Sequence, residues 1–103
     1  NFTKVAQVGE HDPHSLYVDA AKLTYPLKVR AWCLDDVFHP FGMKGKKKLT
    51  KFFKDEKLSL LSKNSVWVLE SGDAIVWVIG LRPDDRYKVT SATNKVLKIQ
   101  WNT

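Results

Sequence analysis

The sequence has a single cysteine, Cys33, among 103 residues. One cysteine excludes a disulfide within the chain and a cysteine-ligated zinc cluster, and it is typical of a reducing compartment, here expected to be the cytoplasm. Because Cys33 lies in the apolar run at residues 31–34, we expect its thiol to be buried. No apolar run approaches the roughly 20 residues that span a bilayer, and no signal peptide opens the chain, so we expect no membrane partner.

Nucleotide-binding and metal-binding motifs are also missing. The glycines of segment 42–46 have neither the Walker spacing nor the dinucleotide-binding spacing, so no ATP site is expected in this chain. His11 and His14 are separated by a proline and lack the helical spacing of a paired-histidine metal site. The carboxylate pairs at 35–36 and 84–85 are adjacent in sequence, and adjacent residues of a strand point to opposite faces. The sequence therefore predicts no catalytic residue, no metal and no cofactor in this domain.

Positive charge, by contrast, is plentiful and lies mostly in one segment. The net charge of the chain is +6, and residues 44–57 hold seven lysines against two acidic residues, which leaves +5 in that segment. Gly42 and Gly45 precede the run and can adopt the positive φ angles that let a backbone approach a partner closely. Dense lysine beyond a flexible turn is suited to contacting nucleic-acid phosphates, and the candidate contact residues are Lys44, Lys46, Lys47, Lys48, Lys51 and Lys54. A solvated lysine face on a surface helix would explain the same charge run.

Three arginines are secondary candidates for the same contact. Arg30 lies in a predicted strand on the face expected to meet solvent, where an ordinary exposed arginine is an equally good interpretation. Arg82 and Arg86 flank the acidic pair at 84–85, which could bind both of them in a local ion network. We expect that pair to neutralise Arg82 in part and to leave Arg86 and Lys88 available to the basic face.

The hydrophobic pattern predicts one mainly β domain over residues 1–103, of the α+β class, with a single short helix. Leu49, Phe52 and Phe53 have the i, i+3, i+4 spacing of a helix with an apolar face, and a lysine stripe would follow another face through Lys47, Lys51 and Lys54. Strands are predicted where apolar and polar residues alternate or where short apolar runs occur, over residues 2–8, 15–19, 27–32, 66–69, 74–79, 86–90 and 96–101.

Two of these strand predictions also specify burial. In the strand at 27–32, alternate residues from Leu27 through Val29 to Ala31 should face the core, and Arg30 and Trp32 should face solvent. The runs at 66–69 and 74–79 are almost continuously apolar, so these strands should be central and covered on both faces. A hairpin at Ser71-Gly72-Asp73 should join them, with two core tryptophans, Trp67 and Trp77.

In their order along the chain, these motifs resemble the C-terminal domain of the bacterial tRNA(Ile)-lysidine synthetases, in the form found in Bacteroidetes. The core of the resemblance is Pro40-x-Gly42-x-x-Gly45-x-Lys47-Lys48-Leu49, followed by the pair Phe52-Phe53. It extends to the strand Ile75-Val76-Trp77-Val78-Ile79-Gly80 and to Arg86-Tyr87-Lys88-Val89-Thr90, and it covers about residues 15–99.

The resemblance implies a compact domain with an unusual, β-sandwich-like topology, which binds tRNA at the C-terminal end of a longer enzyme. Asn1, in place of an initiator methionine, also indicates a piece of a longer protein. In that family an N-terminal domain uses ATP to attach lysine to the wobble cytidine of tRNA(Ile), so ATP and lysine are substrates of the parent ligase. The adenylating loop Ser-Gly-Gly-x-Asp-Ser does not occur here, so this domain alone should not be an enzyme. The implied partners are tRNA(Ile), at its acceptor stem, and the catalytic domain of the same chain.

A second hypothesis is a protein-docking module that contacts the catalytic domain or a second subunit. The predicted helix would then present Phe52 and Phe53 as interface anchors, because an exposed aromatic pair marks a binding patch. Burial of both rings in a core would contradict this version of the hypothesis. The sequence leaves the oligomeric state open.

Overall fold

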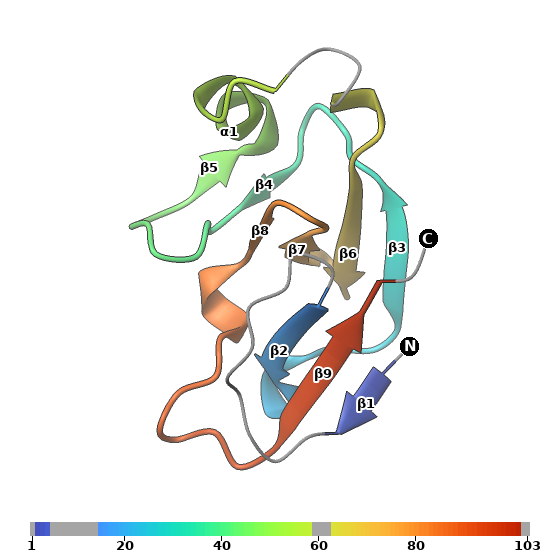
Figure 1. The fold of residues 1–103 in the computed structure, drawn as a ribbon, viewed down its shortest axis with the longest axis vertical. Coiled ribbons are helices and arrows are strands. Elements are labelled where there is room, and N and C mark those ends of the chain that lie inside the picture. Colours follow the sequence, from blue (N-terminus) through green and yellow to red (C-terminus); the bar gives the residue numbers. More distant parts are fainter. Residues whose placement is uncertain (1, 5–14, 59–62, 102–103) are drawn as a thin grey trace.

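The computed structural model describes residues 2–4, 15–58 and 63–101, which form three antiparallel sheets and a short helix (Figure 1). The first sheet has the order β1-β9-β2, with strands Phe2–Lys4, Val96–Gln100 and Ser15–Asp19. The second has the order β3-β6-β7-β8, with strands Leu27–Ala31, Trp67–Ser71, Ala74–Val78 and Arg82–Pro83. The third pairs β4 (Val37–Phe38) with β5 (Lys47–Lys48), and β5 leads directly into helix α1 (Leu49–Asp55). The described residues also include two 3-10 helices, η1 (Ala20–Lys22) and η2 (Asp85–Tyr87). This part of the chain is mainly β with a short α-helix, α1, as predicted.

The second sheet lies between two hydrophobic cores, which gives the domain its sandwich-like packing. On one face lies the helix-side core, formed by Phe38, Leu49, Phe52, Phe53, Val66, Val68, Ile75 and Val78. On the other lies the strand-side core, formed by Val18, Leu69, Val76, Trp77, Tyr87, Leu97 and Ile99. A β-bulge leaves Val76 unpaired between the Leu69–Trp77 and Glu70–Ile75 pairs, so Val76 and Trp77 both face the strand-side core. Strands β6 and β7 are the two inner strands of this sheet, as predicted, and the predicted hairpin joins them.

The burial predicted for β3 is right at Leu27 and wrong further along the strand. Leu27 packs against the strand-side core, but Val29 is 42% exposed and Ala31 is exposed as well. Trp32 turns toward the helix-side core instead, where its ring meets Phe53 edge-on with centroids 4.9 Å apart. The physical reason is that different elements cover the two ends of the strand. Helix α1 lies toward the C-terminal end of β3, whereas the first sheet lies toward its N-terminal end (Figure 1).

Three further predictions are corrected by the structure. Trp67 pairs with Ala31 at the uncovered end of β3 and is therefore 46% exposed, not part of the core. Cys33 is exposed because Trp32 takes the inward position and Cys33 begins the following turn, in which Asp36 N–H donates to its carbonyl oxygen. The strand predicted over 86–90 does not form, since the Asp84 side chain accepts a hydrogen bond from the backbone N–H of Arg86 and caps η2. Residues 5–8 of the first predicted strand lie outside the described residues.

Candidate nucleic-acid interface

The glycine–lysine motif forms a loop and a strand–helix junction. Residues 39–46 connect β4 with β5, and Lys48 is the N-cap residue of α1. Gly42 and Gly45 have φ angles of +81° and +80°, which confirms the predicted positive φ. A Cβ atom on either glycine would meet nothing within 4 Å, so it is the left-handed backbone, not lack of space, that favours glycine at these positions.

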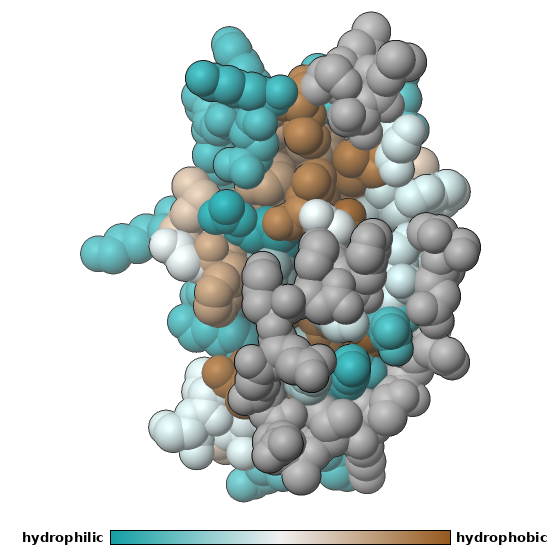
Figure 2. Space-filling view, viewed as in Figure 1, coloured by the Kyte–Doolittle hydropathy of each residue, from teal (hydrophilic) through white to brown (hydrophobic). Residues whose placement is uncertain are grey.

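Four of the candidate lysines have no acidic partner among the residues that the structure describes. Lys44 and Lys46 lie on the loop, Lys48 ends β5 and Lys54 lies on α1, and all four are exposed. Within the described part of the chain, none of them has a carboxylate oxygen within 4.0 Å. Figure 2 shows hydrophilic surface over α1 and at the edge of the molecule near the loop before β5. These lysines can bind a phosphate without first breaking an ion pair.

Lys47 and Lys51, by contrast, converge on one carboxylate. Lys47 Nζ contacts Asp55 Oδ2, and Lys51 Nζ lies 3.1 Å from Asp55 Oδ1. The two lysines, Lys47 more strongly, hold the pKa of Asp55 below its ordinary value. The predicted lysine stripe is thus interrupted, because Lys47 lies in β5 before the helix and, with Lys51, ties β5 to α1.

The apolar face of α1 belongs to the helix-side core. Leu49, Phe52 and Phe53 are at most 1% exposed, and the Phe52 ring meets Phe38 edge-on with centroids 5.1 Å apart. The helical spacing predicted from the sequence is confirmed. Burial of both rings contradicts their use as anchors for a docked protein.

Arg30 is held in an ion-pair network. Its Nη1 and Nη2 atoms donate to the two carboxylate oxygens of Asp36, each at 2.9 Å, and Nη2 also donates to Glu70 Oε2 at 3.1 Å. Hydrogen bonding to Asp36 raises the pKa of Arg30 further, although burial opposes the shift. Arg30 is therefore half-buried between β3, β6 and the turn before β4 rather than solvated as predicted.

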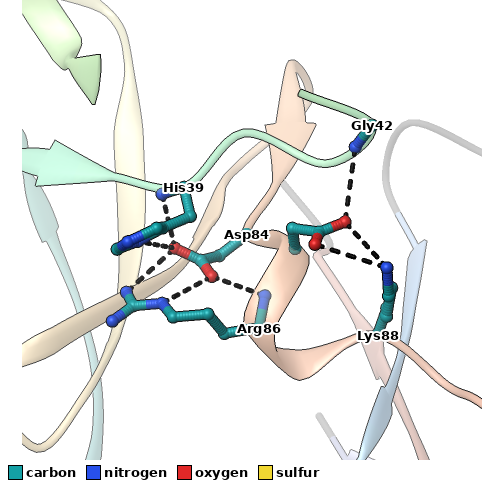
Figure 3. A network of polar contacts seen from close by, with 6 residues as sticks. His39, Gly42, Asp84, Arg86 and Lys88 are labelled. Atoms are coloured by element: carbon teal, nitrogen blue, oxygen red, sulfur yellow. Dashed lines mark hydrogen bonds and ion pairs between the residues drawn. The ribbon is translucent and has the colours of Figure 1, made fainter. Parts of the chain in front are cut away.

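Arg86 binds the carboxylate of Asp84, and the same carboxylate anchors the glycine loop (Figure 3). Arg86 donates to it from its backbone N–H at 2.8 Å, from Nε at 2.9 Å and from Nη2 at 3.0 Å. The backbone N–H of His39 donates to Asp84 Oδ2 at 2.8 Å. His39 Nδ1 is buried 3.9 Å from that oxygen and has no hydrogen bond to the described residues. The side chain of Asp84 is fully buried, so the Arg86 charge offsets the cost of burying it, and this hydrogen bonding raises the pKa of Arg86.

Arg82 has weaker partners than the other two arginines. Its Nη2 atom lies 4.0 Å from Glu56 Oε1, and its guanidinium carbon lies 5.8 Å from the centroid of the Phe52 ring. Its Nη1 atom donates to the carbonyl oxygen of Phe41 at 3.4 Å. The acidic pair at 84–85 binds Arg86 and Lys88 instead, so the neutralisation predicted for Arg82 falls on those two residues.

The sequence identifies the basic residues of this surface but does not show which of them form ion pairs. Lys51 and Asp55 stand at i and i+4 of a predicted helix, a spacing that does indicate an ion pair. The contact of Arg30 with Glu70 joins residues 40 positions apart, and no local pattern indicates it.

Among the described residues, neither a cluster of metal ligands nor a membrane-spanning helix is present. None of their His, Cys, Asp and Glu side chains forms a group of three able to hold a metal ion, and His11 and His14 lie outside them. No helix among the described residues is long and apolar enough to cross a membrane.

Comparison with known proteins identifies close relatives. The tRNA(Ile)-lysidine synthase of Parabacteroides distasonis is 46% identical over 92 residues, which cover 89% of this chain and 21% of that protein. The tRNA(Ile)-lysidine synthase of Bacteroides thetaiotaomicron is 42% identical over 79 residues, which cover 77% of this chain and 18% of that protein. The chain therefore spans about a fifth of the length of these relatives.

A family model and a solved structure agree with these relatives. A crystal structure of the TilS C-terminal domain is similar with a TM-score of 0.74 at 23% identity, over 99% of this chain and 82% of that one, which shows a shared fold. Residues 27–101 match the family model described as the TilS substrate C-terminal domain. The motif from Pro40 to Leu49 lies inside that match, and the chain belongs to the TilS substrate C-terminal domain family.

Proposed function

We propose that this chain is the C-terminal, tRNA-binding domain of a cytoplasmic tRNA(Ile)-lysidine synthetase. The relatives carry that name, and the chain corresponds to about a fifth of their length. In the whole protein, the catalytic part would use ATP to attach lysine to the wobble cytidine of tRNA(Ile), and this domain would hold the tRNA. ATP and lysine would bind to the catalytic part, and no residue of this domain would be catalytic.

The observation that carries the proposal is the set of exposed lysines on the loop, β5 and α1 that have no acidic partner in the described part of the chain. Side chains cannot read the deep, narrow major groove of A-form RNA, so lysines grip its phosphates and leave selection to shape or to other contacts. We assign the main phosphate contacts to these four lysines, Lys44, Lys46, Lys48 and Lys54. Secondary contributions would come from side chains that already have partners, namely Lys47, Lys51, Arg82, Arg30 and Arg86.

The acceptor stem is the proposed contact on the tRNA, because the anticodon must reach the catalytic part. Titrating this chain into tRNA(Ile), an acceptor-stem minihelix and an anticodon-stem hairpin of equal length tests this. We expect similar affinity for tRNA(Ile) and the minihelix, and weaker binding of the anticodon hairpin. Equal binding of the two hairpins would contradict the acceptor-stem contact, and no binding at low salt would contradict RNA binding altogether.

A second candidate function, docking on the catalytic part, is favoured by another face of the domain. Val29, Ala31 and Trp67 are exposed on the paired strands β3 and β6, and Ala31 pairs with Trp67 in register. Apolar side chains gathered on an uncovered sheet face mark a protein contact. In the whole synthetase, Trp67→Ser should speed proteolytic separation of this domain, and an unchanged cleavage rate would contradict docking through this face.

A further inference from the structure

We propose that Asp84 and Asp85 are positioning residues of the RNA-binding surface. They fix the base of the glycine loop so that Lys44 and Lys46 are presented to RNA on an ordered backbone. The inference rests on the proposed RNA binding and deepens it. Both residues are acidic, so by their charge alone they would oppose RNA binding.

Asp84 holds the start of the loop. Its carboxylate accepts the backbone N–H of His39 at 2.8 Å, and its own backbone forms an isolated β-bridge with Pro40. The N–H of Asp84 donates to the carbonyl of Val76 at 2.8 Å, which ties this point to the central strand β7. Arg86 supplies three further donors to the same carboxylate (Figure 3). The beginning of the loop is thereby joined to a central strand of the second sheet.

Asp85 holds the next part of the loop. Its N–H donates to the carbonyl of His39 at 2.6 Å, and its Oδ1 atom accepts the N–H of Gly42 at 3.4 Å. Lys88 Nζ donates to both carboxylate oxygens, at 3.2 and 3.3 Å. The Gly42 N–H, and after it Lys88, lowers the pKa of Asp85 below its ordinary value, so the carboxylate is charged at neutral pH.

The loop between His39 and Gly42 is thus bonded to one short segment, residues 82–85. Phe41 completes the set, because its N–H donates to the carbonyl of Pro83 at 2.9 Å and its carbonyl accepts Arg82 Nη1 at 3.4 Å. The side chains of Lys44 and Lys46, just beyond this anchored base, stay exposed. Ordering a flexible loop on binding costs conformational entropy, and a loop held in place before binding avoids most of that cost.

The test uses variants in which the change of charge and the loss of loop order should change RNA affinity in opposite directions. Asp85→Ala makes the chain more positive and releases Lys88, so charge alone would tighten RNA binding. It also removes the acceptor for Gly42, so the positioning role predicts binding weakened by about two- to tenfold. Asp73→Ala is the matched control, since it makes the same charge change at an exposed residue of the β6–β7 turn and should bind at least as tightly as the unchanged chain. Asp85→Asn keeps an acceptor oxygen and should fall between the two.

Affinity for an acceptor-stem minihelix and hydrogen exchange of the Gly42 amide are measured on each variant. We expect Asp85→Ala alone to combine weaker binding with faster Gly42 exchange. Binding by Asp85→Ala as tight as by Asp73→Ala would overturn the positioning role, and so would unchanged Gly42 exchange. A third outcome is that the unchanged chain does not bind RNA, although its Gly42 amide exchanges more slowly than that of Asp85→Ala. This outcome would overturn the proposed function, and the positioning role with it.

Discussion

The guanidinium of Arg30 binds both carboxylate oxygens of Asp36, through Nη1 and Nη2 at 2.9 Å each. The carbonyl oxygen of Asp36 in turn accepts the backbone N–H of Leu49, the first residue of α1, at 3.0 Å. The start of the lysine-bearing helix is thereby linked to β3, and through Glu70 to β6. We therefore expect both the stability of the fold and the placement of the basic helix to depend on this ion pair.

Replacement of Arg30 should destabilise the fold. Arg30→Met leaves Asp36 and Glu70 mostly buried without their counterion, so we expect the free energy of unfolding to fall by about 1–3 kcal/mol. Urea unfolding measures this change. The control is Lys28→Met, an exposed lysine of the same strand, which should change the free energy of unfolding by less than about 0.5 kcal/mol. If Arg30→Met changed the free energy of unfolding as little as Lys28→Met does, the network would contribute nothing to stability.

The Arg30–Asp36 pair also predicts an acid dependence. Burial raises the pKa of Asp36, but hydrogen bonds from Arg30 and from the Cys33 N–H outweigh it and leave the pKa below the ordinary 3.8. As pH falls below that value the unfolded chain takes up the proton first, so stability is complete above it and is lost as pH falls through the folded pKa. Asp36→Asn has no carboxyl group to titrate at this position, so its stability should lack this contribution to the pH dependence.

Urea unfolding of the unchanged chain and of Asp36→Asn, at about pH 6 and about pH 2.5, checks this sign. The variant should be less stable at the higher pH, and the difference between the two proteins should shrink at the lower pH. A difference that stays constant or grows on acidification would contradict the assigned pKa shift.

Two double variants of equal charge separate the unpaired lysines from the paired ones. Lys44→Gln with Lys46→Gln removes two free charges, whereas Lys47→Gln with Lys51→Gln removes two charges that already bind Asp55. The first pair should reduce the salt slope of RNA binding by about 1–2, because each lost phosphate contact removes about 0.9. The second should reduce it less. Filter binding at several salt concentrations measures both slopes, and the reverse ranking would contradict our assignment of the main phosphate contacts.

Truncation of Phe52 should damage the core. Phe52→Ala opens a cavity beside Phe38, and we expect the free energy of unfolding to fall by about 3–5 kcal/mol. Phe41→Ala, the same substitution at a residue that is 48% exposed, should cost less than about 1 kcal/mol. Chemical denaturation compares the two variants. A stable Phe52→Ala chain would mean that the ring does not support the helix-side core.

The sequence predicts this fold well where the deciding residues are neighbours. The spacing of Leu49, Phe52 and Phe53 predicts α1, and the turn at Gly72, whose φ is +58°, predicts the β6–β7 hairpin. Which face of β3 is buried depends instead on α1 and on the first sheet, which are distant in sequence. Alternation alone therefore assigns Trp32 to solvent, although it packs on Phe53.

The same limit applies to the candidate interface. Local composition identifies the lysine run and the glycines with positive φ. It cannot show that Asp84 is buried or that it binds His39, 45 positions earlier in the chain. Acidic residues beside a basic site look unfavourable in the sequence, and their structural role follows only from the folded loop.

The most direct test of RNA binding by this domain is the salt dependence of its affinity for the acceptor-stem minihelix. About three to six phosphate contacts predict that log affinity falls with log salt concentration at a slope of about −3 to −5. A slope near zero, or no binding at the lowest salt, would contradict the claim that the exposed lysines hold RNA by its phosphates.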